Sequence, residues 1–185
     1  MKKIAAILIA VMATGCAPKK WEAKETSLDR IGKSDKKLEA MINALQPSAN
    51  EESITPVEFT RTETTARECV VEDAARSHAA LQYLSINTKQ IELLVDEAGL
   101  KMSQNTNGDL NAVKFSLTEA RSISGNTLAS CVETLGAIDV NECKVDIVKA
   151  PYAELKTSCE ALSGLQKKLD IQLLRIADLE QTIKI

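Results

Sequence analysis

Aromatic side chains are scarce in this chain of 185 residues, since tryptophan, tyrosine and phenylalanine together make up 3% of it. Glycine and proline are also few, and no segment alternates apolar and polar residues long enough to form a useful strand. A domain built on a β-sheet is therefore not expected. The apolar run from Ile4 to Ala13 has about ten residues, whereas a transmembrane helix needs about twenty. No basic face stands out, which argues against a nucleic-acid partner.

Motifs that carry catalysis or hold cofactors are missing as well. The sequence has no nucleophile elbow, no phosphate-binding glycine loop and no metal-ligand motif. Its one histidine, His78, follows Glu72 and Asp73, but it lies at neither the three- nor the four-residue spacing that joins one helical face. We interpret His78 as a boundary residue of a helix. The sequence therefore predicts a non-enzymatic protein without cofactor or metal.

The N-terminus combines positive charge, an apolar run and a cysteine. Lys2 and Lys3 precede the run that starts at Ile4, and the segment "ATGC" (13–16) follows it. This arrangement resembles the signal peptide and lipobox of bacterial lipoproteins. The resemblance is confined to the signal region; it implies that residues 1–15 are removed and that the sulfur of Cys16 carries a diacylglycerol. The alternative is an ordinary secretory signal with an incidental cysteine.

Lipidation would fix the location of the chain. A single acyl chain holds a protein weakly, with about 0.8 kcal/mol per buried CH₂, so a triacylated Cys16 would give the stable anchor that one chain cannot. Ala17 stands where inner-membrane lipoproteins of the resembling class commonly carry aspartate, which favours the periplasmic face of the outer membrane. Removal of residues 1–15 takes away two lysines and no acidic residue, so the net charge changes from −3 to −5.

The cysteines that remain after Cys16 favour disulfides. They are even in number, as is typical of exported chains with paired cysteines: Cys69, Cys131, Cys143 and Cys159. No pair has the C-x-x-C spacing, and His78 lies nine residues from Cys69, so a zinc site or a thioredoxin-like redox pair has little support. Buried free thiols are the alternative.

Apolar residues recur at steps of three and four from Trp21 onward, which predicts helices almost throughout. We expect four helices, near 22–46, from Thr55 to about Ala98 or fraying on toward Asn105, from about 110 to Leu135, and from Pro151 nearly to the C-terminus. The loops between them are expected at about 46–55, 104–109 and 136–150. The second helix has the clearest start signal, because Thr55 can cap it, Pro56 suits its first position and Glu58 completes a capping box.

Short turns between long amphipathic helices favour antiparallel neighbours. The fold class that we predict is all-α. It is an elongated, antiparallel, coiled-coil-like bundle of three long helices with a shorter N-terminal helix. The bundle domain is expected at 25–185, after a lipidated tether at 16–24, and disulfides staple it.

The same geometry indicates which cysteines pair. A turn centred near residue 107 places Cys69 opposite about residue 145, close to Cys143. A turn near residue 143 places Cys131 opposite about residue 155, one helical turn from Cys159. We therefore prefer the pairs Cys69–Cys143 and Cys131–Cys159. The rival connectivity would have to join Cys69 to Cys159, which sit several turns apart.

Polar residues interrupt the apolar stripes at six positions: Asp35, Ser77, Thr88, Ser124, Gln166 and Glu180. Such residues would be costly if buried without partners, so we expect stripes that are partly exposed, or covered by the first helix or by another protein. The first helix contains no cysteine and lies between the tether and a proline loop. We expect it to be the most mobile element.

Together these features favour an interaction protein. The expected role is that of a lipid-anchored periplasmic bundle that recruits, positions or inhibits an envelope protein partner. A carrier or sensor of an apolar ligand held between the helices is the alternative, and an enzyme is the third possibility.

Overall fold

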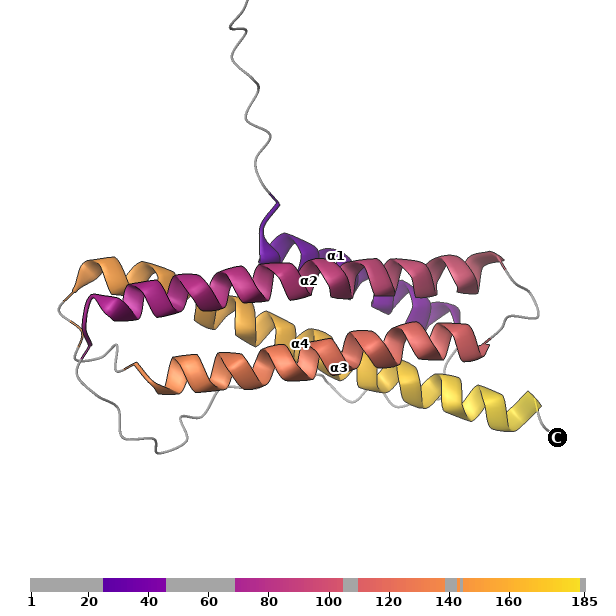
Figure 1. The fold of residues 1–185 in the computed structure, drawn as a ribbon. Helices are drawn as coiled ribbons and strands as arrows, with labels where there is room; N and C mark the ends of the chain where they lie inside the picture. The colour runs from indigo at the N-terminus through magenta and orange to yellow at the C-terminus, as the bar shows by residue number, and fades with distance from the viewer. Residues whose placement is uncertain (1–24, 46–68, 105–109, 139–142, 144, 184–185) are drawn as a thin grey trace, which may run out of the picture.

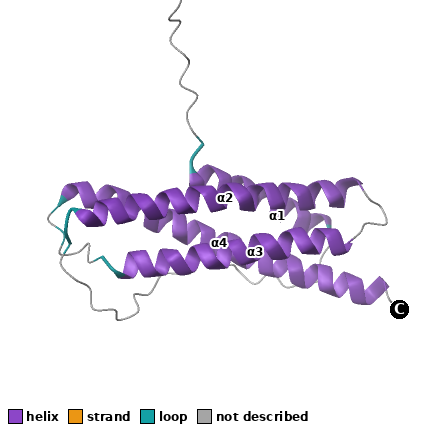
Figure 2. Ribbon diagram, in the orientation of Figure 1, coloured by secondary structure: helices purple, strands orange, loops and turns teal. Residues whose placement is uncertain are grey.

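The computed structural model describes residues 25–45, 69–104, 110–138, 143 and 145–183. Its four helices are α1 (Ser27–Ala44), α2 (Glu72–Gln104), α3 (Leu110–Gly136) and α4 (Asp146–Ile183). They pack lengthwise into one elongated bundle, and no strand is present among the described residues (Figures 1 and 2). The predicted all-α bundle of three long helices and a shorter N-terminal one is confirmed.

Helices α2, α3 and α4 run up, down and up, as the sequence predicts. Asn87 of α2 donates to the hydroxyl of Thr127 in α3 at 2.8 Å, and Ser116, further back along α3, donates to Glu97 of α2 at 3.3 Å. Lys114 of α3 in turn pairs with Glu180 near the end of α4 at 2.7 Å. Partners therefore rise in number along one helix as they fall along the next, which defines antiparallel neighbours.

Helix α1 runs parallel to both of the helices that it contacts. On α2, Arg30 meets Ser85 and Lys37 meets Asp96, so both numbers rise together. Figure 1 shows the same relation, since the colours of α1 and α2 advance in one direction while α3 returns. The short helix is packed into the bundle rather than lying apart from it, because its side chains Ile31, Leu38 and Met41 are buried.

The core is divided along the length of the bundle. The largest cluster lies where α1 covers α2 and α4, and it includes Leu38, Val95, Leu117 and Leu169. Two smaller clusters surround the disulfides, one around Leu84 and Leu155 and the other around Ala74 and Val148, and neither includes a residue of α1. One half of the bundle is thus held by four helices and the other by three helices with two covalent links.

The expected exposure of the polar interruptions is wrong for three of the six. Ser77, Thr88 and Ser124 are fully buried, and the hydroxyl of Thr88 donates to the carbonyl oxygen of Ser85 at 3.2 Å. Small hydroxyl side chains let neighbouring helices approach closely. The charged interruptions are paired instead of free, since Asp35 contacts Lys168 and Glu180 contacts Lys114, each at 2.7 Å. Gln166 is half-buried.

The described part of α2 starts later than predicted. It starts at Glu72, and Cys69 and Val70 before it are not helical, so a continuous helix from Thr55 is wrong. The predicted cap at Thr55 lies outside the described residues. At the other end α2 continues through Gly99 to Gln104, which agrees with the longer of the two expected ends, and Gly99 does not cap the helix.

Helix α4 starts at Asp146, not at Pro151, so the predicted loop 136–150 is too long at its C-terminal end, whereas its start agrees with the end of α3 at Gly136. Pro151 lies buried in the second helical turn. As the sixth residue of α4, Pro151 has no N–H to donate to the carbonyl oxygen four residues back, so the helix lacks one internal hydrogen bond at this point. Asp146 in the first turn also suits the positive end of the helix dipole.

Candidate functional site

The predicted anchor cannot be placed in the fold. Cys16, the tether 16–24 and residues 1–15 lie outside the described residues. Across the ranges that the structure describes, no helix is both long and apolar enough to cross a membrane. The first described residue, Glu25, leads directly into α1, whose start is fixed by Thr26. Any tether therefore joins the bundle through α1.

Both preferred disulfides are present in the structure. Cys69 is joined to Cys143 with a Cα–Cα distance of 5.0 Å, and Cys131 is joined to Cys159 with a Cα–Cα distance of 6.1 Å. Cys131, Cys143 and Cys159 are buried. With all four sulfurs joined in pairs, these cysteines present no free thiol as a nucleophile, and each bond links two parts of the bundle.

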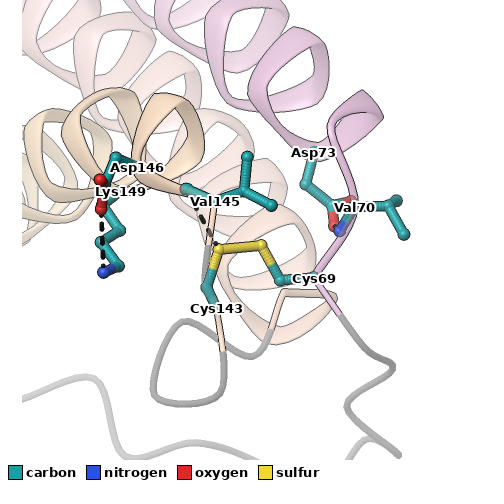
Figure 3. The surroundings of a disulfide bond; sticks show 7 residues. All are labelled: Cys69, Val70, Asp73, Cys143, Val145, Asp146 and Lys149. Carbon is teal, nitrogen blue, oxygen red and sulfur yellow. Dashed lines mark hydrogen bonds and ion pairs between the residues drawn. A yellow bond between two sulfur atoms is a disulfide. The ribbon is translucent and has the colours of Figure 1, made fainter.

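The Cys69–Cys143 bond ties the start of α2 to the chain before α4 (Figure 3). Beside it, the buried carboxylate of Asp73 accepts the backbone N–H of Val70 at 2.9 Å, while the N–H of Asp73 donates to the Val70 carbonyl at 2.9 Å. This reciprocal pair stops the helix from extending backward, because Val70 is held out of helical geometry. It explains why α2 begins at Glu72.

The one histidine lies at the surface of the bundle. His78 is exposed on α2, and no group of three or more histidine, cysteine, aspartate or glutamate residues that could hold a metal occurs in the described ranges. Asp73, which precedes His78, is turned toward Val70 and lies 3.6 Å from Arg76. The carboxylate of Asp73 thus pairs with residues at the start of α2.

An exposed apolar row runs along the outside of α2. Ile86, Leu93 and Leu100 are 67%, 61% and 55% exposed, and they recur every seventh residue. Seven residues are close to two helical turns, so the three side chains lie on one line, about 10 Å apart. The line is opposite the core face of α2, which carries Ile91 and Val95. We call Ile86, Leu93 and Leu100 the α2 outer row.

Charged residues flank the α2 outer row. Glu97 accepts hydrogen bonds from Lys101 at 2.6 Å and from Ser116 at 3.3 Å. The hydrogen bond from Lys101, followed by the charge of Lys101, holds the pKa of Glu97 below its ordinary value. Lys89 is exposed between Ile86 and Leu93. The row is thus an apolar line with a firmly ionised carboxylate on its border.

Sequence reasoning did not identify the α2 outer row. The inward stripe of α2 was the dominant periodic signal, and a second set of large apolar residues at a spacing of seven was available in the same helix. Other exposed apolar side chains, such as Phe115 of α3 and Leu174 of α4, do not form such a row on their helices. Regular repetition on the face opposite the core is the signal that distinguishes it.

Comparison with known proteins identifies no relative. No protein-family model matches the chain, and neither the curated proteins nor the solved structures contain a significant match. The fold therefore defines the class, an all-α bundle linked by two disulfides.

Proposed function

We propose that this protein is a non-enzymatic lipoprotein, anchored through Cys16 at the periplasmic face of the outer membrane, which binds or positions an envelope protein through the α2 outer row. The exposure of Ile86, Leu93 and Leu100 on one line is the observation that carries the proposal. An apolar side chain left in water forgoes about 25 cal/mol for each Å² that a partner would cover. Apolar side chains that recur along one face of a helix are typical anchors for a partner.

The shape and charge of the row favour a protein partner over a bilayer. The row is only one side chain wide, with the carboxylates of Asp96 and Glu97 close beside it. A single helix or strand fits such a line, whereas anionic headgroups would repel the two carboxylates. The expected partner is an envelope protein with its own narrow apolar row.

Two features support the compartment. The N-terminal segment ending in Cys16 resembles a lipoprotein signal, and the two disulfides of the body suit an oxidising environment outside the cytosol. The alternative function, a carrier of an apolar ligand between the helices, has less support. Leucines from different helices, including Leu38, Leu117 and Leu169, are fully buried and pack into one cluster.

Site-specific photo-cross-linking in cells tests the partner. A photoreactive residue at Leu93 should give a defined adduct with one envelope protein, and Leu100→Glu in the same chain should suppress that adduct. Asn126, which is exposed on α3, is the matched control position and should give no such adduct. Equal adducts from positions 93 and 126, or none from the row, would contradict the proposal.

The anchor needs a separate test. Labelled palmitate should enter the wild-type chain but not Cys16→Ser, and the substituted chain should leave the membrane fraction. A wild-type chain that remains unlabelled and soluble would exclude lipidation without excluding partner binding.

A further inference from the structure

We propose that the groove between α2 and α4 is a docking site for an amphipathic helix, which α1 occupies as an internal ligand and which a partner helix of the same chemistry can enter when α1 leaves. The inference goes beyond the proposed function, because it concerns the covered groove and not the α2 outer row. Three observations support it: the contacts that hold α1 in the groove, the covalent connections of α1, and the charges that border the groove.

The seat of α1 has an acidic border on α2. Lys37 donates to Asp96 at 2.8 Å, and Glu92 lies 3.8 Å from both Arg30 and Lys33. The guanidinium of Arg30 also donates to the carbonyl oxygen of Ser85 at 3.0 Å. One edge of the docked helix must therefore be basic.

The opposite border, on α4, is basic. Lys168 donates to Asp35 at 2.7 Å, and Arg175 donates to the carbonyl oxygen of Ile42 at 2.7 Å. Ile42 lies in the last turn of α1, where backbone carbonyls lack partners within the helix and carry the negative end of its dipole. Arg175 thus recognises a helix C-terminus. The two borders together select a helix with a basic edge and an acidic edge that points its C-terminus toward Arg175.

Helix α1 is held by a few buried apolar side chains and by partly exposed ion pairs. Three apolar side chains of α1 are buried in the core, namely Ile31, Leu38 and Met41. Between them lies Ser34, whose buried hydroxyl has no hydrogen-bond partner among the described residues. The ion pairs that border α1 are partly exposed, so salt screens them. Such a contact is easier to open than the core that α2, α3 and α4 share.

The covalent connections let α1 leave without unfolding the rest. Both disulfides join parts of α2, α3, α4 and their connections, and α1 contains no cysteine. Its covalent link to Cys69 is the segment 46–68. The smaller clusters around the disulfides contain no α1 residue and do not depend on it.

A labelled synthetic peptide of residues 25–45 serves as the probe for the groove. Full-length Leu38→Asp, in mild detergent and with its disulfides intact, should bind the peptide in trans at least ten-fold more tightly than the wild-type chain does, because its own α1 no longer competes. The peptide with Lys37→Glu should bind about two- to five-fold more weakly, and Asp96→Lys in the groove should restore it. The peptide with Lys36→Glu is the charge-matched control, since Lys36 is exposed, and it should bind like the unmodified peptide.

Hydrogen exchange of the wild-type chain gives an independent measurement. Amides of α1 should exchange at least ten-fold faster than those of the buried part of α4, and the difference should grow at high salt. Three results would each overturn the proposal: global unfolding of Leu38→Asp, a folded variant that does not bind the peptide, or equal protection of α1 and α4. None of these results would affect cross-linking from the α2 outer row, so failure of this inference is distinguishable from failure of the proposed function.

Discussion

The Nζ atom of Lys168 in α4 lies 2.7 Å from Oδ2 of Asp35 in α1, although the two residues are 133 positions apart in the chain. Arg175 and the Ile42 carbonyl have the same separation of 133. The constant separation shows that α1 and α4 run parallel and in one register. This pairing, together with the contact of Lys37 with Asp96, fixes the position of the first helix.

The Asp35–Lys168 pair should contribute modestly to stability. Because both side chains are partly exposed, we expect Asp35→Ala to lower the free energy of unfolding by about 0.2–1 kcal/mol. Urea denaturation of Asp35→Ala, Lys168→Ala and the double variant gives the coupling energy directly. Additive effects of the two substitutions would show that the pair contributes nothing.

Leu38 should be the residue of α1 that matters most for packing. Its side chain is fully buried in the largest core cluster, so Leu38→Ala should lower the free energy of unfolding by about 2–5 kcal/mol. Glu39→Ala, at the neighbouring exposed position, is the control and should change it by less than about 0.5 kcal/mol. Equal midpoints in urea for the two variants would contradict the packing of α1.

Two glycines should respond differently to alanine. A Cβ atom at Gly32 would meet nothing within 4 Å, so Gly32→Ala should raise the free energy of unfolding by about 0.5–1 kcal/mol through helix propensity. At Gly99 the new Cβ would lie 2.6 Å from Cε of Lys37. We expect Gly99→Ala to displace Lys37 from Asp96 and to gain less stability than Gly32→Ala. In a Lys37→Ala background, the two glycine substitutions should raise the free energy of unfolding equally. Thermal unfolding of both glycine variants, with and without Lys37→Ala, checks this.

The Cys131–Cys159 disulfide should stabilise the end of the bundle that lacks α1. Its sequence separation is 28, for which the chain-entropy relation gives about 3.6 kcal/mol. We expect the double variant Cys131→Ser, Cys159→Ser to unfold about 2–4 kcal/mol more easily, with Cys69–Cys143 still formed by peptide mapping. An unchanged urea midpoint, or a Cys69–Cys159 peptide in the wild-type map, would contradict this arrangement.

The start of α1 should weaken in acid. Asp29 accepts the side-chain and backbone hydrogen bonds of Thr26, and these bonds hold the pKa of Asp29 below its ordinary value. A carboxylate with a lowered pKa in the folded state stabilises the fold above its unfolded pKa, near 4, and this contribution is lost as the pH falls through the folded pKa. Wild type should therefore exceed Asp29→Asn in urea midpoint at pH 6, and the gap should be smaller at pH 2. A gap of equal size at both pH values would contradict the capping role.

The sequence by itself determined most of the helical body. The three- and four-residue periodicity predicts helices in all four described regions, and the "NTNGD" turn at 105–109 predicts that α2 and α3 are antiparallel. From that antiparallel geometry followed both cysteine pairs that the structure contains. These features depend on local spacing, so they can be read without knowledge of distant contacts.

Only the tertiary structure decided where α4 begins, which way α1 points and which polar residues are buried. The segment after Gly136 contains β-branched and aspartate residues of low helix propensity, yet Asp146–Ala150 are helical, and Val148 among them is fully buried. The direction of α1 depends on contacts such as Asp35 with Lys168, which no local pattern encodes. Ser77 and Ser124 are buried because neighbouring helices lie close at those positions, and that closeness is a property of the packed bundle and not of any one segment.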